Sequence, residues 1–326
     1  MARARRSGVA AAAAALALLV AGCSDDGGGQ RAADAAPTSA SASAPAPTTS
    51  ATELAPAATP TTAPPAVPEG RYVEEVFTEL EHERGLRYGA ALDADGEQVE
   101  LALDLWAPAD DPLAARPVVV LVHGGGFVSG DRSSMAPYGE ALARRGFVTA
   151  TVSYRLRDRL PPHGWSELEP ETERAAHDAQ HDVQAAVRWL RAHADDHGID
   201  PERIAVLGYS AGAITAVEVG SSPDDPGTSG TPGERSDVSA VVSIAGTAAH
   251  HDALVAPGPA VLMLHGALDA TVPIAAAKAT CEAARTGGLP CHLVVFEQAG
   301  HDVVATERTA IVDETTEFLV GALGLR

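Results

Sequence analysis

The sequence predicts an α/β protein whose mostly parallel sheet is covered by helices on both faces and begins with an antiparallel pair of strands. Strand-like and helix-like segments alternate from residue 117 onward, the order typical of βαβ units. Residues 118–122 are a continuous Val and Leu run, which is typical of a strand buried on both faces. Gly146 and Gly198 each end a helix-like segment, as expected for helix C-caps.

The individual elements follow in a regular order along the chain. Residues 72–80 and 99–105 have β-rich patterns, so we expect them to form the antiparallel pair. Apolar residues at Val183, Ala186, Val187 and Leu190 predict an amphipathic helix. We expect further strands at 117–122, 147–154, 204–207, 238–244, 260–264 and 292–296, and helices at 134–145, 178–194, 213–217, 274–285 and 310–323.

The first 70 residues differ in composition from the rest. Residues 1–23 carry three arginines, then an Ala/Leu/Val run that ends at Cys23, the pattern of an export signal. The small residues before Cys23 resemble a bacterial lipobox, so we expect lipidation there, with a plain secretory signal as the alternative. Residues 24–70 are rich in Ala, Pro, Ser and Thr and are expected to be a disordered tether. One domain should then span residues 71–326.

Net charge bears on the binding partners, and cysteine content bears on disulfide formation. The formal net charge is −21, so nucleic acid is not an expected partner. Apart from Cys23, the cysteines are Cys281 and Cys291. An even pair in an exported chain predicts a disulfide that joins the helix 274–285 to the strand 292–296, with two buried thiols as the alternative.

The segment Gly208-Tyr209-Ser210-Ala211-Gly212 lies between an apolar run and a helix-compatible segment. Gly-x-Ser-x-Gly is the pattern of a nucleophile elbow, a sharp strand-to-helix turn that exposes its serine. Gly208 and Gly212 would let the strand and the helix approach closely. The same letters could form an ordinary turn, but their position between a strand and a helix favours a nucleophile at Ser210.

A glycine-rich loop, His123-Gly124-Gly125-Gly126, follows the predicted strand 117–122. Consecutive glycines let backbone N–H groups turn toward a point where a carbonyl oxygen gains negative charge. We expect an oxyanion hole formed by the N–H groups of Gly125, Gly126 and Ala211, with His123 positioning the loop. A phosphate-binding loop is less favoured, because no Gly-Lys-Ser/Thr follows.

A serine nucleophile needs a base and an acid that orients the base, in the chain order Ser, Asp or Glu, His. Asp269 comes soon after the strand 260–264, and His301 soon after the strand 292–296. Active sites of open α/β sheets lie at the carboxyl ends of strands, so we expect Ser210, Asp269 and His301 to meet there. Asp302 is a rival acid; a turn-capping aspartate and a loop histidine are the alternative roles for Asp269 and His301.

Other histidines form pairs. His177 and His181 lie four residues apart on one predicted helix face, a spacing that zinc sites use. No third ligand motif follows them, so we interpret them as the solvated start of a helix and predict no metal site. His250 and His251 have no ligand spacing and are interpreted as loop residues.

These motifs resemble the carboxylesterases of the α/β-hydrolase fold, the group that includes hormone-sensitive-lipase-like and feruloyl or acetyl-xylan esterase-like enzymes. The resemblance covers nearly all of residues 72–325. It departs from the hormone-sensitive-lipase branch at Tyr209 and Ala213, so the substrate range of that branch is not carried over. It rests on the two glycine motifs, the Asp269 turn and Gly300-His301, together with residues 86–89, 103–106 and 152–156.

The resemblance implies a serine esterase that needs no cofactor, with Ser210 as nucleophile, His301 as base and Asp269 as the acid. In residues 156–177 the main large apolar side chains are Leu160 and Trp165 amid glutamates, so we expect short acyl esters, free or linked to a polysaccharide. The expected protein is a monomer anchored by lipid at the extracytoplasmic face of the membrane. An amidase or peptidase on the same triad, and a catalytically silent binding protein, are the alternatives.

Overall fold

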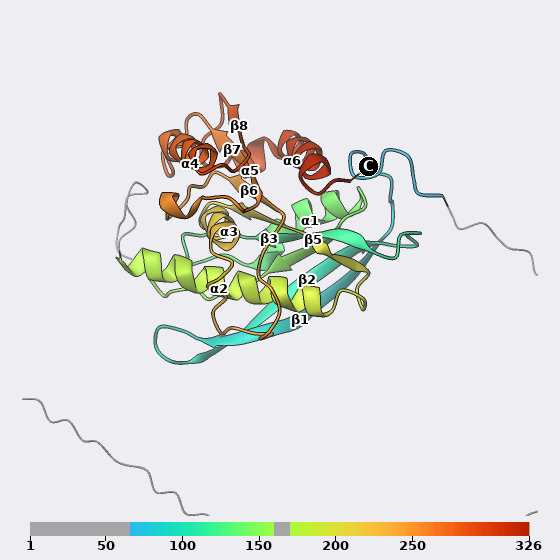
Figure 1. Ribbon diagram of the computed structural model, residues 1–326, viewed down its shortest axis with the longest axis horizontal. Coiled ribbons are helices and arrows are strands. Elements are labelled where there is room, and N and C mark those ends of the chain that lie inside the picture. The colour runs from blue at the N-terminus through green and yellow to red at the C-terminus, as the bar shows by residue number, and fades with distance from the viewer. Residues whose placement is uncertain (1–65, 160–169, 326) are drawn as a thin grey trace, which may run out of the picture. The chain divides into compact units, whose positions relative to one another are not determined.

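The computed structural model describes residues 66–159 and 170–325, which contain an eight-stranded sheet with the order β1-β2-β4-β3-β5-β6-β7-β8 (Figure 1). The β1–β2 and β2–β4 pairs are antiparallel, and the other pairs are parallel. The predicted mostly parallel sheet with antiparallel N-terminal strands is therefore confirmed. The strands are β1 (Leu80–Leu92), β2 (Gln98–Pro108), β3 (Arg116–Val122), β4 (Val148–Val152), β5 (Ile199–Tyr209), β6 (Ala240–Ile244), β7 (Ala260–Gly266) and β8 (Cys291–Phe296).

Helices cover both faces of this sheet. One face packs against α2 (Pro170–Ala192), α3 (Ala211–Ser221) and α4 (Ile274–Thr286), of which α2 and α3 lie side by side (Figure 1). The other face packs against α1 (Ala136–Ala143), α5 (Val303–Thr306) and α6 (Arg308–Ala322). Within the described residues, no helix is both long and apolar enough to cross a membrane.

The apolar run of β3 is explained by these two layers. Val118, Val120 and Val122 point into the core beneath α2 and α3, whereas Val119 and Leu121 point into the core beneath α1 and α6. All five side chains are fully buried. Alternate side chains of a strand face opposite sides of a sheet, so a strand between two helix layers needs an apolar residue at every position.

The prediction of a first strand at residues 72–80 is wrong. Residues 72–73 lie in a turn, with Tyr72 at φ 71°, and residues 75–79 have no regular structure. The segment docks next to the end of α1, where the N–H of Tyr72 donates to the carbonyl of Arg145. The Tyr72 ring packs on Phe147, with the ring centroids 4.9 Å apart. The start of this segment therefore covers Phe147 instead of joining the sheet. The real edge strand, β1, was missed because its first half consists mainly of exposed polar and charged residues, which discourage pairing with another chain at a sheet edge.

Helix α2 begins eight residues before the predicted residue 178, at Pro170. Its first turn carries Glu171 and Glu173, and acidic residues favour a helix N-terminus because they complement the helix dipole. Glu171 and Glu173 thus form the acidic start of a helix that extends further toward the N-terminus than predicted. The predicted signal, Cys23 and most of the tether lie outside the described residues, as do Leu160 and Trp165.

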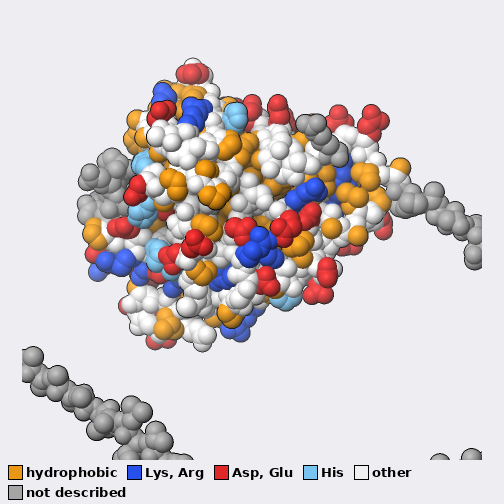
Figure 2. All heavy atoms as spheres, viewed as in Figure 1, with side chains coloured by type: hydrophobic (Ala, Val, Ile, Leu, Met, Phe, Trp, Pro, Cys, Tyr) orange, Lys and Arg blue, Asp and Glu red, His pale blue; other side chains and the backbone are white. Residues whose placement is uncertain are grey.

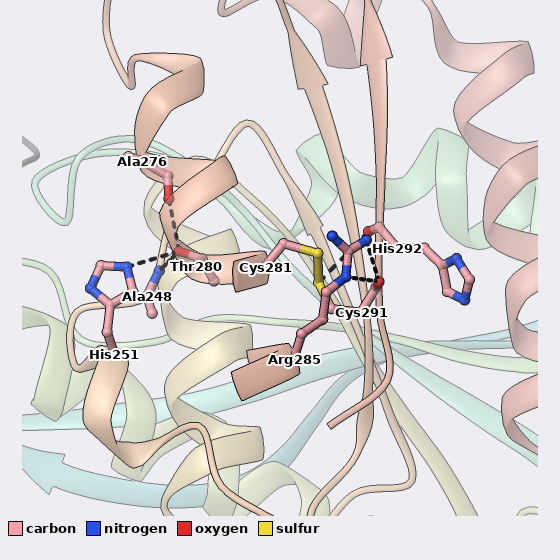
Figure 3. Close-up of a disulfide and its surroundings, with 8 residues drawn as sticks. All are labelled: Ala248, His251, Ala276, Thr280, Cys281, Arg285, Cys291 and His292. Atoms are coloured by element: carbon pink, nitrogen blue, oxygen red, sulfur yellow. Dashed lines mark hydrogen bonds between the residues drawn. A yellow bond between two sulfur atoms is a disulfide. The ribbon is translucent and has the colours of Figure 1, made fainter. Parts of the chain in front are cut away.

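A disulfide joins Cys281 of α4 to Cys291, the first residue of β8, with Cα atoms 5.5 Å apart (Figure 3). The Arg285 guanidinium reinforces the link by donating two hydrogen bonds, of 3.0 and 2.9 Å, to the Cys291 carbonyl. In the chain-entropy description, closing a loop of this length stabilises a fold by about 2–3 kcal/mol. The link fixes the start of the strand whose far end leads to His301.

Candidate active site

Ser210 lies at the turn from β5 into α3 and has a strained backbone, with φ 54° and ψ −119°. Serine rarely adopts a positive φ, and such strain persists only where the surroundings impose it. The Ser210 N–H donates to the Ile244 carbonyl at the end of β6, at 2.9 Å, and its own carbonyl accepts the N–H of Ala213 at 2.9 Å. The turn is therefore held on both sides.

The two glycines of the motif are required by close backbone contacts. A Cβ on Gly208 would lie 1.9 Å from the Gly212 carbonyl oxygen, and a Cβ on Gly212 would lie 2.3 Å from the Val122 carbonyl oxygen. Real Cβ atoms do not approach other atoms so closely. Any side chain at either position would push the start of α3 away from the sheet, so these glycines set the geometry of Ser210.

The structure brings Ser210, His301 and Asp269 together, although they lie far apart in the sequence. His301 Nε2 is 2.9 Å from Ser210 Oγ, and His301 Nδ1 is 2.8 Å from Asp269 Oδ2. Since a carboxylate oxygen accepts, the Nδ1 atom carries the imidazole proton, and Nε2 is free to accept the proton of the serine hydroxyl. This order of groups is the one that activates a serine nucleophile.

Asp269 is fixed by its own loop. Its Oδ1 accepts the N–H groups of Thr271 and Val272, each at 2.8 Å, and its side chain is fully buried. His265 supports the same turn, because its Nε2 donates to the Val272 carbonyl at 2.8 Å and lies 3.4 Å from Asp269 Oδ2. Burial lowers the pKa of His265, which favours a neutral imidazole behind the carboxylate.

Sequence reasoning gave no role to His265, although its position four residues before Asp269 was a usable signal. It also gave no role to the Tyr209 side chain. The Tyr209 hydroxyl donates to the His301 carbonyl at 3.1 Å, and the two rings lie 5.4 Å apart. Tyr209 thus holds the histidine loop from the residue next to the serine. Burial raises the pKa of Tyr209, so its hydroxyl keeps the proton that it donates.

The glycine loop runs directly against this turn. A Cβ on Gly124 would lie 3.1 Å from Ser210 Cβ, and Gly125 and Gly126 have φ values of 123° and 61°. Among the described residues, no hydrogen bond uses the N–H groups of Gly125, Gly126 or Ala211. His123 is buried, stacks on Tyr154 at 4.4 Å and contacts the Gly124 carbonyl through Nδ1 at 2.7 Å. His123 thus holds the glycine loop in position through its contacts with Tyr154 and the Gly124 carbonyl.

Asp302, the rival acid, lies outside this hydrogen-bond chain. It precedes α5, and its carbonyl oxygen accepts the N–H groups of Ala305 and Thr306 at 2.8 and 3.1 Å. In the described part of the chain, the hydrogen bond of His301 Nδ1 goes to Asp269 and not to Asp302. The geometry therefore favours Asp269 as the orienting acid.

Known protein families match most of the domain in two overlapping segments. Residues 103–257 match the BD-FAE family, and residues 238–322 match the TAP-like protein family. Esterase LipC of Mycobacterium tuberculosis is 34% identical over 157 residues, which make up 46% of this chain and 35% of that protein. The matched segment thus spans only about a third of that curated relative's length.

Solved structures are similar over a larger part of the chain. The butyrate-bound esterase 2 of Thermogutta terrifontis has a TM-score of 0.60 at 26% identity, covering 74% of this chain and 99% of that one. The same esterase phosphorylated by paraoxon gives a TM-score of 0.62 at 26% identity, with 75% and 96% covered. The sheet order and these similarities show that the protein has the α/β-hydrolase fold. Within that fold, it is related to the carboxylesterases.

His250 is a further histidine with a strongly shifted pKa. Its Nδ1 is 2.9 Å from Glu218 Oε2, and its Nε2 is 3.1 Å from Glu173 Oε1. The hydrogen bond to the buried Glu218 carboxylate outweighs desolvation and raises the pKa of His250 to about 9. His250 therefore links α2, α3 and the loop after β6, a role that its sequence context did not indicate.

We expect the contribution of His250 to the free energy of unfolding to be full below pH 6.5 and to be lost as the pH rises through about 9. Over this interval the imidazole is charged in the folded protein but neutral in the unfolded chain, so raising the pH removes a proton that favours folding. Urea unfolding of wild type and His250→Gln at several pH values measures the difference. His251→Gln is the control, and a difference that does not change with pH would contradict the assignment.

Proposed function

We propose that the protein is a serine carboxylic-ester hydrolase. The observation that carries this proposal is the chain of hydrogen bonds from Ser210 Oγ through His301 to Asp269, at 2.9 and 2.8 Å. It lies at the carboxyl ends of β5, β7 and β8, the edge at which α/β sheets bind their substrates. The similarity to a T. terrifontis esterase that paraoxon phosphorylates supports a nucleophilic mechanism.

The proposed reaction has two halves that use the same residues. Ser210 Oγ attacks the ester carbonyl while its proton moves to His301 Nε2, and His301 then gives that proton to the departing alcohol. A water molecule next attacks the acyl-serine with His301 again as base, which releases the acid and restores the serine. Asp269 holds the imidazole in the required tautomer and favours its charged form.

Negative charge on the attacked carbonyl oxygen needs donors that already point at it. We assign this role to the N–H groups of Gly125, Gly126 and Ala211. The loop's position against Ser210 and the positive φ values of its glycines support the assignment. Ala211 is the first residue of α3, where N–H groups are unpaired and the helix dipole is positive.

The substrates we propose have short acyl chains, from acetyl to butyryl. Among the described residues, the exposed large apolar side chains next to the site loops are Val128, after the glycine loop, and Leu268, before Asp269. Two isolated side chains form a small apolar surface, whereas a long acyl tail needs a broad one. The similarity to an esterase structure with bound butyrate also favours a short acyl group.

Hydrolysis of p-nitrophenyl acetate should be lost in Ser210→Ala by up to about a millionfold in kcat, because the nucleophile is removed. Asp269→Asn should lower kcat by about ten-thousandfold through the wrong histidine tautomer, whereas the matched control Asp302→Asn should stay within about tenfold of wild type. Fluorophosphonate labelling and a parallel p-nitroanilide series complete the test. Faster cleavage of anilides than of matched esters, or unlabelled wild type, would refute an esterase.

The acyl preference is tested separately with p-nitrophenyl esters of increasing chain length. We expect kcat/KM to be highest between two and four carbons, because longer tails find too little apolar surface to bury. Lipase-like behaviour, with the maximum at eight carbons or more, would show that an acyl-binding tunnel exists elsewhere.

We also propose that the domain is held at the extracytoplasmic face of the membrane by a lipid on Cys23. Small residues directly before this cysteine, at the end of an apolar run, support the proposal. Cys23→Ala should release the protein from the membrane fraction or leave the signal uncleaved, because the anchor would be lost. Fractionation and mass spectrometry of the N-terminus measure both. Wild type found free in the medium would contradict the anchor.

A further inference from the structure

A second group of convergent side chains lies between α2 and the segment that follows α3. His177 and His181 are one helical turn apart on α2, with ring centroids 4.0 Å apart. Asp225 comes 48 residues after His177, and its carboxylate oxygens lie 2.8 Å from His177 Nε2 and 3.2 Å from His181 Nε2. The ligand atoms of the three residues all lie within 4.8 Å of one another.

Of the two contacts between these histidines and Asp225, only one is a hydrogen bond. His177 Nε2 and Asp225 Oδ2 form a hydrogen bond. His181 Nε2 lies 3.2 Å from Asp225 Oδ1, within ion-pair distance, but does not meet the geometry of a hydrogen bond. This buried atom has no hydrogen-bond partner among the described residues. A metal ion between this buried nitrogen and the carboxylate would coordinate both, because an imidazole nitrogen and a carboxylate oxygen are both metal ligands.

The surroundings hold the second histidine and the aspartate in place. The backbone at Gly227, with φ 61°, packs so closely on His181 that a Cβ there would lie 2.3 Å from the ring Cγ. The segment that carries Asp225 is anchored by the buried Arg188, which donates to the carbonyls of Pro226 and Gly230 at 2.7 and 2.8 Å. The Asp225 N–H donates to the Ser222 carbonyl at 3.2 Å. The site is therefore built on a rigid base.

Neighbouring charges are already paired with each other. Asp178, next to His177 in the sequence, contacts both Arg157 and Arg155. Asp182 is buried and accepts hydrogen bonds from the Arg155 backbone and side chain. These two carboxylates are not available as ligands. Figure 2 shows histidine side chains at the surface on the left of the view, where Figure 1 has the N-terminal half of α2. The side chains of His177 and Asp225 are about half exposed, so solvent ions can reach them.

We propose that His177, His181 and Asp225 bind a divalent transition metal of the zinc class. Two imidazoles and one carboxylate suit Zn²⁺, Ni²⁺ or Cu²⁺ better than Mg²⁺ or Ca²⁺, which prefer oxygen ligands. In a tetrahedral zinc site neighbouring ligand atoms lie about 3.3 Å apart, close to the 2.8 and 3.2 Å separations between the carboxylate and the imidazoles. Both imidazoles would carry their proton on Nδ1, and water would fill the fourth position.

The site would be structural rather than part of the ester chemistry. Ser210 precedes the first residue of α3, whereas Asp225 follows the other end of this 11-residue helix, which puts about 16 Å of helix between them. A bound ion would cross-link α2 to the segment after α3. Metal binding at this position therefore does not depend on whether the protein is an esterase.

The test uses untagged protein that has been stripped with EDTA. Competition between the protein and a chromophoric chelator should show one equivalent of Zn²⁺ bound, Co²⁺ should give the visible absorption of a tetrahedral site, and saturating Zn²⁺ should raise Tm by about 5 °C. Each of His177→Gln, His181→Gln and Asp225→Asn should weaken Zn²⁺ binding by at least about tenfold and remove the Tm shift. The control His193→Gln, directly after the C-terminal end of α2, should bind as wild type does.

Two results would overturn the proposal. One is a wild-type protein whose Zn²⁺ affinity equals that of the doubly substituted His177→Gln, His181→Gln protein. The other is equal weakening by His193→Gln and by the ligand variants, which would indicate binding at scattered surface histidines. Circular dichroism of each variant establishes that it is folded, and Asp225→Asn, at an exposed position, tests the site with the least disturbance of α2.

Discussion

The backbone of Ser210 is held at a positive φ by the close approach of β5, α3 and β3, and the candidate active site depends on this contact. Gly212 packs on the last carbonyl of β3, and Gly208 packs on the carbonyl of Gly212 itself. The strain at Ser210, of order 1–3 kcal/mol for such a conformation, is offset by the burial of the strands and helix around it. Moving α3 outward would relax the serine and also separate it from the glycine loop.

The histidine and the acid depend on the other half of the sheet. Asp269 follows β7 and His301 follows β8, and these parallel neighbours end side by side. The disulfide fixes the start of β8, and Tyr209 fixes the loop at its far end through the His301 carbonyl. The serine and the histidine are thus coupled twice, once through their own side chains and once through the residue that precedes the serine.

Much of the fold was predictable because its signals are local. The buried parallel strands are continuous apolar runs. The order of serine, acid and histidine motifs along the chain selected three residues that form a chain of hydrogen bonds in the structure. The edge strand β1 was not predictable from hydrophobic pattern, since an edge strand exposes most of its side chains. The beginning of α2 was misplaced because the periodic apolar residues that indicate this helix begin only at Val183, well after its acidic first turn.

The sequence could not predict the contacts of residues that belong to no recognisable motif. Asp225 lies in a segment between α3 and β6 whose fold is set by Arg188, a buried cation bound by backbone carbonyls and the Ser236 hydroxyl. Burial lowers the pKa of Arg188, and several oriented carbonyls take the place of a carboxylate partner.

This arrangement also ties α2 to α3. Gln184 of α2 donates to the carbonyl of Ser222, at the C-terminal end of α3, at 2.8 Å, while the N-terminal end of α3 carries the strained serine turn. A helix of this length moves as a unit, so α2 and the Asp225 segment brace the nucleophile from the opposite end of α3. A metal ion bound by His177, His181 and Asp225 would therefore make this support of α3 more rigid. The proposed ester hydrolysis itself would take place at the loops on the carboxyl edge of the sheet.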